Sequence, residues 1–529
     1  MNEKPKRKLG WRLLRWGLIG LAVLITLAAV LVTEENWRGK RAWENYKRAA
    51  EAHGERFEWS ALLPVGAAGG TAITNAPGLK DFVKIQFNER TGEILKMGGT
   101  NVNDFIKNSA SHIRKTPETN FFGERNFRIT RDDGTWPKQT SGDWTRGRLT
   151  DLKIWQEYYR TPTTNSPDEF PVAPQPQTPA KDVLLALSKY DADIEKLRGG
   201  TNQMLSLFAG SKLDESFISA SLEYYSATKS RCQVLQLRAV AELADEQPAA
   251  ALEDIQLMLR LDDEQCQMPL LIAQLVGIAE TAMTLQPVYE GLAQHRWNDA
   301  QLAELEQALA ALDMLSNYPC AMRGERAFAI TTLEDQRTTR AIKYSDPDSG
   351  KVTTISLRWT PSAFFYRNEL SFAQMYDQFM LPLVDMTNRT VSVAAYRTTE
   401  ADFKEAKHWS LYNVQARMIF PAVGKAVIKF ALIQSQVDLA RTACALERFS
   451  LAHGNYPETL DALVPQFIAQ LPHDIINGKP LHYRRTDDGK FVLYSVGWDE
   501  KDDGGKIVLT KGGSVDREKG DWVWQYPQK

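Results

Sequence analysis

The sequence lacks the short motifs by which many enzymes are recognised. Its seven histidines form no HxH or HExxH pair, the spacings that commonly hold a catalytic metal. It also has no Gly-x-Ser-x-Gly elbow, Walker loop or dinucleotide fingerprint, and the glycine-rich Gly66–Gly70 lacks the Lys-Ser/Thr pair that would hold phosphate. These absences favour a non-enzymatic protein, although an active site assembled from distant segments leaves no local motif.

Cysteine is scarce. Its four occurrences lie far apart and form no CxxC pair, so a zinc site is not expected: Cys232, Cys266, Cys320 and Cys444. If the body lies outside the cytoplasm, one or two disulfides are expected, and four cysteines allow three complete pairings. Buried free thiols are the alternative, and the sequence leaves both open.

The chain also lacks a basic excess. Its formal net charge is -2, with 43% hydrophobic and 25% charged residues, as is usual for a globular protein. Six Lys/Arg residues and one Glu precede residue 33, so the remainder is mildly acidic. This balance argues against a nucleic-acid partner, and nothing in the sequence indicates a small-molecule substrate.

One long stretch is both free of charge and strongly apolar. Trp16–Val32 has no charged residue, and at about 1.5 Å per residue a helix of this length spans about 25 Å, the short end of a membrane helix. The basic residues before it predict a cytoplasmic N-terminus and an extracytoplasmic body. A cleaved signal peptide is the alternative, but no small-x-small cleavage site follows the run. Residues 1–33 are therefore predicted to be a basic leader and membrane anchor.

Residues 34–178 read as a mixed α/β region that ends in a proline-rich linker. Residues 34–60 are expected to continue the helix outward, and Asp81–Met97 has the pattern of a β-hairpin. Aromatic side chains then crowd a short interval: Trp136, Trp144, Trp155, Tyr158 and Tyr159. Such side chains usually form a core. The alternative is that residues 121–160 line a cleft for polysaccharide or peptide.

Residues 179–425 read as a helical body. Asp182–Leu197 has helical spacing, Gln247-Pro248 begins another helix, and Asn298-Asp299 caps a third. Pro269–Gln286 is strongly apolar but contains Gln274 and Glu280, which favours a buried helix over a second membrane span. The short helix–turn–helix units resemble tetratricopeptide-like hairpins without a 34-residue repeat.

Arg323, Glu325 and Arg326 lie close together in this helical context. Charged groups at this spacing favour an ion-pair network that fixes helix packing over a catalytic role.

Residues 426–529 carry an ordered series of motifs. A helix ending ALERFSLAHGNYP is followed by TLDALVP, GKPLHY, FVLYSVG, DEKDDGG and DWVW. Together, over about residues 430–527, they resemble the C-terminal domain of the major pseudopilins of type II secretion. The resemblance implies a helix packed on a small antiparallel sheet, with a calcium-binding loop after the YSxG strand.

By this resemblance the first calcium ligands are Asp499, Asp503 and Asp521. Calcium takes six to eight oxygen ligands, so Asp502, Ser495 and backbone carbonyls would complete the shell. The spacing excludes an EF-hand, because Lys501 occupies its third position and Thr510 stands where its bidentate Glu belongs. The alternative is an acidic, solvated turn.

Two departures separate the chain from a filament subunit. Gly10-Trp11 matches the start of a pseudopilin processing site, but Arg15 stands where the family has the Glu that neutralises its neighbour's N-terminus. Roughly 400 residues also separate the apolar helix from the pilin-like helix, whereas a pseudopilin joins them directly. The full layout resembles a group of bacterial membrane-anchored proteins, and that resemblance implies architecture and no activity.

The sequence therefore predicts a mainly helical α+β protein with a single N-terminal transmembrane helix, a helical-hairpin body and a small C-terminal helix-plus-sheet domain. We expect a scaffold or interaction protein of the inner (cytoplasmic) membrane with an envelope protein partner, linked to a secretion or pilus-like system. An envelope hydrolase and a calcium-responsive periplasmic sensor are the alternatives.

Overall fold

The computed structural model describes residues 7–62, 86–87, 94–97, 100–101, 127–131, 137, 142–161, 170–199, 215–345, 352–405 and 408–527. The glycine-rich Gly66–Gly70, Trp136 and the leader residues before Arg7 lie outside the described residues.

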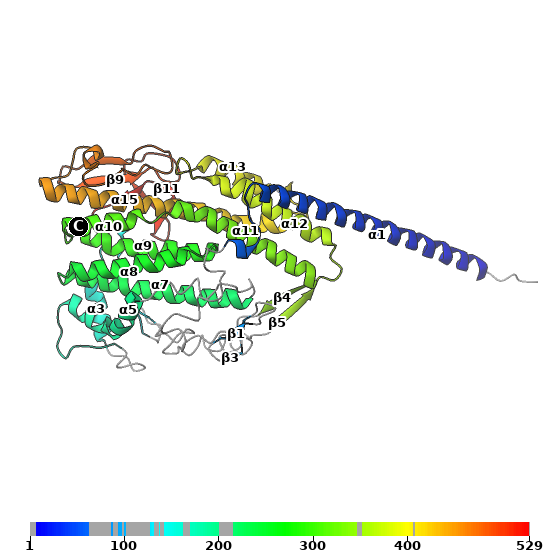
Figure 1. Ribbon diagram of the computed structural model, residues 1–529, viewed down its shortest axis with the longest axis horizontal. Helices are drawn as coiled ribbons and strands as arrows, with labels where there is room; N and C mark the ends of the chain where they lie inside the picture. The colour runs from blue at the N-terminus through cyan, green and yellow to red at the C-terminus, as the bar shows by residue number, and fades with distance from the viewer. Residues whose placement is uncertain are drawn as a thin grey trace, which may run out of the picture.

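Within the described residues the fold is α+β and mainly helical, as predicted. The long helices of the body lie side by side (Figure 1). The helices are α1 (Arg7–Ala52), α3 (Leu152–Arg160), α4 (Pro179–Leu187), α5 (Asp191–Gly199), α7 (Glu215–Ala244), α8 (Pro248–Cys266), α9 (Leu271–Ala293), α10 (Asp299–Ala310), α11 (Met314–Thr339), α12 (Ser362–Gln374), α13 (Val393–Lys404), α14 (Val414–Gly424) and α15 (Ala426–His453).

The described strands form small antiparallel sheets. The first has the order β1-β2-β3 and pairs Phe87 with Ile94 inside the predicted hairpin; its strands are β1 (Gln86–Phe87), β2 (Ile94–Met97) and β3 (Thr100–Asn101). Two hairpins follow: β4 (Ala341–Ser345) with β5 (Val352–Ser356), and β6 (Val384–Asp385) with β7 (Thr390–Val391). The C-terminal strands make a sheet of order β12-β9-β8 and a hairpin: β8 (His482–Arg485), β9 (Phe491–Ser495), β10 (Ile507–Leu509), β11 (Val515–Gly520) and β12 (Trp522–Trp524).

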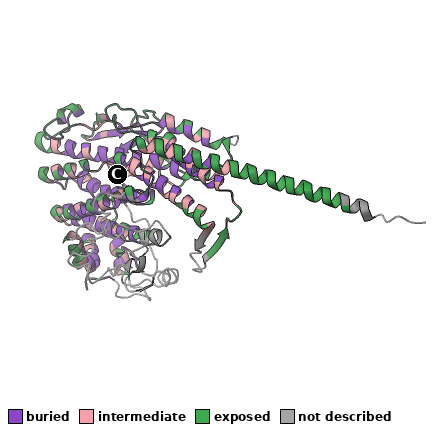
Figure 2. Cartoon of the chain, turned by 45° about the vertical axis from the view of Figure 1, so that its right-hand side comes forward, coloured by how far each residue is buried: buried purple, intermediate pink, exposed green. Residues whose placement is uncertain are grey.

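Helix α1 projects from the body for much of its length (Figure 1). No proline interrupts it, and its leucine- and alanine-rich composition suits a helix. Its apolar half is exposed along its length, in contrast to the mostly buried inner faces of the body helices (Figure 2). By length and composition α1 and α9 are both long and apolar enough to cross a membrane. The most apolar stretch of α9 is 61% buried, which agrees with the predicted core helix.

The C-terminal segment packs directly on the helical body. Helix α15 lies between α9 and α10 on one side and strands β9 and β12 on the other. One hydrophobic core joins Val288 of α9, Val437 and Leu446 of α15, Leu493 of β9 and Trp524 of β12. The helix and sheet thus bury their apolar faces against each other and against the body, which fixes the position of the acidic loop that follows β9.

Candidate functional site

The C-terminal half of α1 docks on α12 through close contacts. The Asn36 side-chain oxygen accepts a hydrogen bond from the Ala363 N–H at 2.7 Å, satisfying one of the free donors at the start of α12. Gly39 lets the two helices approach, since a Cβ there would lie 3.3 Å from the Ala363 Cα. Trp43 is buried and packs edge-on against Phe57. The C-terminal half of α1 is therefore fixed to the body by close contacts.

An ion-pair cluster secures the end of the same helix. We call Tyr46, Glu55, Arg323, Arg326 and Asp377 the clamp. Glu55 accepts from Arg323 Nη2 at 2.8 Å and from Arg326 Nη2 at 2.7 Å. Arg326 also pairs with Asp377, which accepts from the Tyr46 hydroxyl at 2.9 Å. The Arg326 side chain is fully buried, so its charge depends on these two carboxylates.

The clamp shifts the titration of its carboxyl groups. Hydrogen bonds from Arg323 lower the pKa of Glu55 to about 2, against the opposing effect of burial. Burial raises the pKa of Asp377 despite the neighbouring Arg326. The predicted ion-pair role of Arg323 and Arg326 is confirmed.

Glu325 takes no part in the clamp. It accepts a hydrogen bond from the Leu271 N–H at 2.9 Å, so it caps the start of α9. The three neighbouring charges thus serve two different contacts.

The predicted calcium loop is held by its own backbone. Asp499 accepts from the N–H groups of Lys501 and Gly520, each at 3.1 Å. The buried Asp521 accepts from three loop N–H groups, at 2.7 to 3.3 Å: those of Asp503, Gly505 and Lys506. Asp499 and Asp521 therefore close the loop as hydrogen-bond acceptors.

Of the other three predicted ligands, Asp503 has an exposed side chain and meets Asp521 only through its N–H. Asp502 and Ser495 have other partners. Asp502 accepts from the Tyr494 hydroxyl at 2.8 Å and from the Gly504 N–H at 2.9 Å. Ser495 is buried and donates to Asp474 at 2.9 Å. Both side chains therefore have hydrogen-bond partners other than Asp521.

These oxygens do not converge as a calcium shell would require. Among the described residues no group of three or more His, Cys, Asp or Glu side chains is placed to hold a metal ion. The carboxylates of Asp499 and Asp521 accept hydrogen bonds from loop N–H groups, which use lone pairs that a cation would need. Calcium binding stays a prediction from the resemblance.

A polar chain that the sequence did not reveal crosses the contact between the body and the C-terminal segment. Glu447 of α15 accepts from the Tyr456 hydroxyl at 2.7 Å and lies 2.5 Å from His295 Nδ1. Tyr456 in turn lies 2.6 Å from the Tyr526 hydroxyl. His295 has the left-handed φ of +52° and is exposed. One end of the chain is therefore open to solvent.

Beside this chain lies a small pocket. Its wall includes Tyr289, Glu447, Phe491, Trp524 and Tyr526. Although about 240 Å³ is free of atoms, much of that is open solvent, and the enclosed part has room for about one water. The geometry suits a bound water that bridges polar groups and not a substrate.

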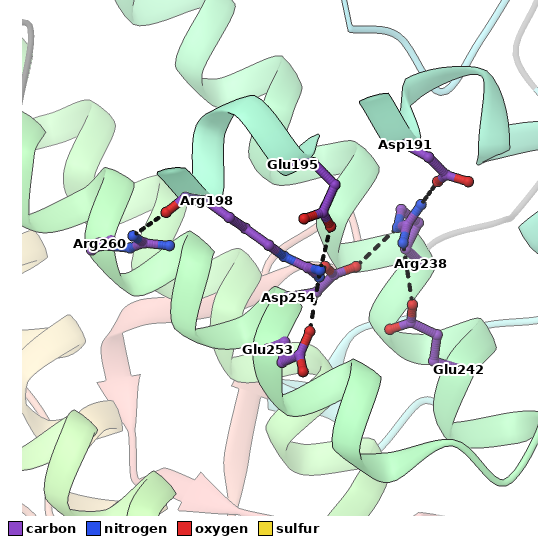
Figure 3. Close-up of polar contacts among 8 residues, drawn as sticks. All are labelled: Asp191, Glu195, Arg198, Arg238, Glu242, Glu253, Asp254 and Arg260. Carbon is purple, nitrogen blue, oxygen red and sulfur yellow. Dashed lines mark hydrogen bonds and ion pairs between the residues drawn. The ribbon is translucent and has the colours of Figure 1, made fainter. Parts of the chain in front are cut away.

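Two clusters of buried charge lie deeper in the body. Asp254 is fully buried and accepts from Arg198 at 2.6 Å and from Arg238 at 3.0 Å, which ties α5 to α7 and α8 (Figure 3). Asp262 accepts from the Thr281 hydroxyl at 2.6 Å, and burial raises its pKa to about 7. Near it, the fully buried Glu280 has no hydrogen-bond partner among the described residues for either carboxyl oxygen. Burial raises its pKa well above the usual range.

Three of the aromatic residues proposed for a cleft are packed inside the protein. Trp144 is buried and lies 5.2 Å from Trp524, ring centre to ring centre. Trp155 stacks on Tyr159, and both are buried. The core interpretation therefore holds for these three residues.

All four cysteines are free, and two of them, Cys232 and Cys444, are buried. The sequence left disulfides and free thiols open, and the structure shows free thiols.

Comparison with protein-family models, with curated proteins and with solved structures gives no match.

Proposed function

We propose that this chain is a membrane-anchored, extracytoplasmic scaffold or interaction protein of the bacterial cell envelope. The observation that carries the proposal is helix α1, which is exposed through its apolar half and clamped to the body through its other half. In this proposal α1 crosses the inner membrane once, with the N-terminus in the cytoplasm.

The exposure of α1 supports a lipid environment. The side chains of Leu18, Leu21, Leu24, Leu27 and Leu31 are each more than half exposed. Transfer of each such side chain out of water is worth about 1.5–3 kcal/mol. A bilayer provides that transfer for the whole run, and the basic residues that precede it favour a cytoplasmic N-terminus.

The body supports binding more than catalysis. Stacked helices present extended surfaces to protein partners, and the pocket beside Glu447 has room for about one water. The link to a secretion or pilus-like system rests on the resemblance of the C-terminal motifs and on the helix packed against an antiparallel sheet.

Cell fractionation tests the anchor. We expect the full-length chain to stay in membranes after alkaline extraction, and protease added to spheroplasts to digest the body while sparing an N-terminal tag. Recovery of a soluble chain that begins after residue 33 would show a cleaved signal peptide and overturn the anchor.

Chemical crosslinking in intact cells, followed by purification in mild detergent, tests the scaffold. We expect at least one envelope protein to be retained by the full chain and not by a control consisting of residues 1–62. Recovery of the chain alone, or of the same proteins with the control, would contradict a scaffold role for the body.

A further inference from the structure

The point at which α1 leaves the bilayer can be located from its contacts. The charge-free run ends at Val32, and Asn36 already contacts Ala363 at the start of α12. Four residues of helix correspond to about 6 Å. The polar zone on each side of the hydrocarbon core is about 5–7 Å thick. The beginning of α12 therefore lies at the level of the lipid headgroups.

An exposed tryptophan lies beside the start of α12. Trp359 is in the turn between β5 and α12, and its side chain is 89% exposed. The β4–β5 hairpin and the start of α12 lie at the end of the body from which α1 projects (Figure 1). Arg358 lies next to it, 5.7 Å from the centre of the Trp359 ring, where its guanidinium can meet a lipid phosphate.

A second exposed segment, residues 409–412, is held at the same depth as the start of α12. The Asn368 side chain donates to the Phe364 carbonyl at 2.8 Å and to the Leu411 carbonyl at 3.0 Å. The Asn368 side chain thus joins the Leu411 carbonyl to the Phe364 carbonyl. Phe364 follows Ala363, which binds Asn36. Leu411 therefore lies at about the same depth along α1 as Asn36. Leu411 is nevertheless 75% exposed.

The same segment carries two further aromatic residues, Trp409 and Tyr412, whose side chains are 45% and 40% exposed. Arg367 lies 5.7 Å from the Tyr412 ring and also pairs with Glu35 of α1 at 3.7 Å. This pair ties the segment to the helix at the point where it leaves the apolar run.

We propose that these side chains form a surface that rests in the headgroup layer of the membrane crossed by α1. We call it the interfacial patch: Trp37 of α1, which follows Asn36 and is 59% exposed, together with Trp359, Trp409, Leu411 and Tyr412. Trp and Tyr are enriched at this depth because their rings are apolar and their N–H or O–H groups reach water. The patch lies beside the anchor, and its side chains are 40–89% exposed among the described residues. It rests on the proposed function, since without the anchor the patch has no membrane beside it.

Site-specific probes in the full-length chain test the patch. The chain is reconstituted into phosphatidylethanolamine–phosphatidylglycerol vesicles with an environment-sensitive fluorophore at Leu411→Cys, at Leu24→Cys in the anchor, or at the exposed Lys511→Cys in the C-terminal hairpin. The labelled wild-type chain gives the background from the native cysteines. Quenching is measured with aqueous iodide and with lipids that carry a nitroxide near the headgroup or deep in the acyl chain.

We expect iodide to quench the Leu411 probe several-fold less than the Lys511 probe, and the headgroup nitroxide to quench it strongly. The Leu24 probe should respond to the deep nitroxide. Iodide quenching of Leu411 equal to that of Lys511, with Leu24 still in lipid, would overturn the patch alone. Iodide access at Leu24 would overturn the anchor. Protection of Leu411 from both quenchers would show that protein covers it, which also overturns the lipid contact.

Discussion

Replacing Glu55 by Gln removes one charge from the clamp while keeping the size of the side chain. Glu55 is about one-fifth exposed, and it accepts hydrogen bonds from both Arg323 and Arg326. Hydrogen bonds that involve charged groups contribute about 1.5–3 kcal/mol, and partial exposure reduces the value through screening. We expect the variant to lose about 2 kcal/mol of local stability at neutral pH, which corresponds to about 30-fold in an opening equilibrium.

Hydrogen exchange of the full chain in detergent measures this opening. Backbone amides in residues 43–52 of α1 exchange when the clamped segment opens locally, and Glu55→Gln should exchange about 30-fold faster there, the same 2 kcal/mol expressed as a ratio. Glu44→Gln is the matched control on the same helix. Its pair with Lys40 is 3.6 Å long and half-exposed, so it should change exchange by less than about twofold.

The pH dependence provides the decisive result. The pKa of Glu55 is lowered from about 4.5 to about 2, so its stabilisation is fully present above pH 4.5 and is lost as the pH falls toward 2. At about pH 3.5 the opened state binds a proton, and the difference between wild type and Glu55→Gln should shrink to a few-fold. A ratio that is the same at pH 7 and pH 3.5, or no larger than that of the control, would refute the clamp.

Three further outcomes follow from other parts of the chain. Gly324→Ala should destabilise severely, because the new Cβ would lie 1.3 Å from the Pro269 carbonyl oxygen, whereas Gly199→Ala meets no atom within 4 Å and should leave the melting temperature nearly unchanged. Asp262 has a pKa raised to about 7, so its contribution to stability is present at acid pH and is lost as the pH rises from about 4 to 7. Melting temperatures of Asp262→Asn should therefore decline less than those of the wild type over this range, because the other buried acids still contribute. If the loop binds calcium, calcium should raise the melting temperature relative to chelator, and Asp499→Ala should abolish the increase. Equal melting temperatures with calcium and with chelator would refute calcium binding.

Signals confined to a few neighbouring residues were predictable from the sequence. Pro248 begins α8, as expected from its position after Gln247. Asn298 caps α10 and forms a reciprocal pair with Gln301, the signature of a capping box. Such features are encoded within one helical turn, so they need no knowledge of the fold.

Tertiary contacts overrode two local predictions. The helix predicted at Asp182–Leu197 breaks at Ser188–Tyr190, where the buried Tyr190 hydroxyl binds the Arg128 backbone at 3.0 Å. The apolar run expected to end at Gln286 continues as α9 to Ala293, with Pro287 inside the helix. In both cases a buried contact outweighs the local preference of the chain.

The contacts that form the candidate sites join residues far apart in the sequence, which the sequence alone did not reveal. Glu55 lies 271 positions from Arg326 in the chain, and His295 lies 152 from Glu447. Charged residues have no periodicity that joins such partners, so the sequence identified Arg323 and Arg326 but not what they bind. For the acidic loop after β9, the sequence revealed which carboxylates are present and how they are spaced. It did not reveal which groups these carboxylates face in the fold.

The unbroken course of α1 has a mechanical consequence. A bilayer whose thickness differs from the apolar length of a helix is matched by a change in helix tilt. In the proposed membrane anchor, the clamp and the contact with α12 join α1 rigidly to the body, so a change in the tilt of α1 would turn the whole body with it. The C-terminal strands lie toward the end of the body away from the projecting part of α1 (Figure 1), where a given rotation produces the largest displacement. Membrane thickness would thereby set the height and angle at which the C-terminal segment is presented.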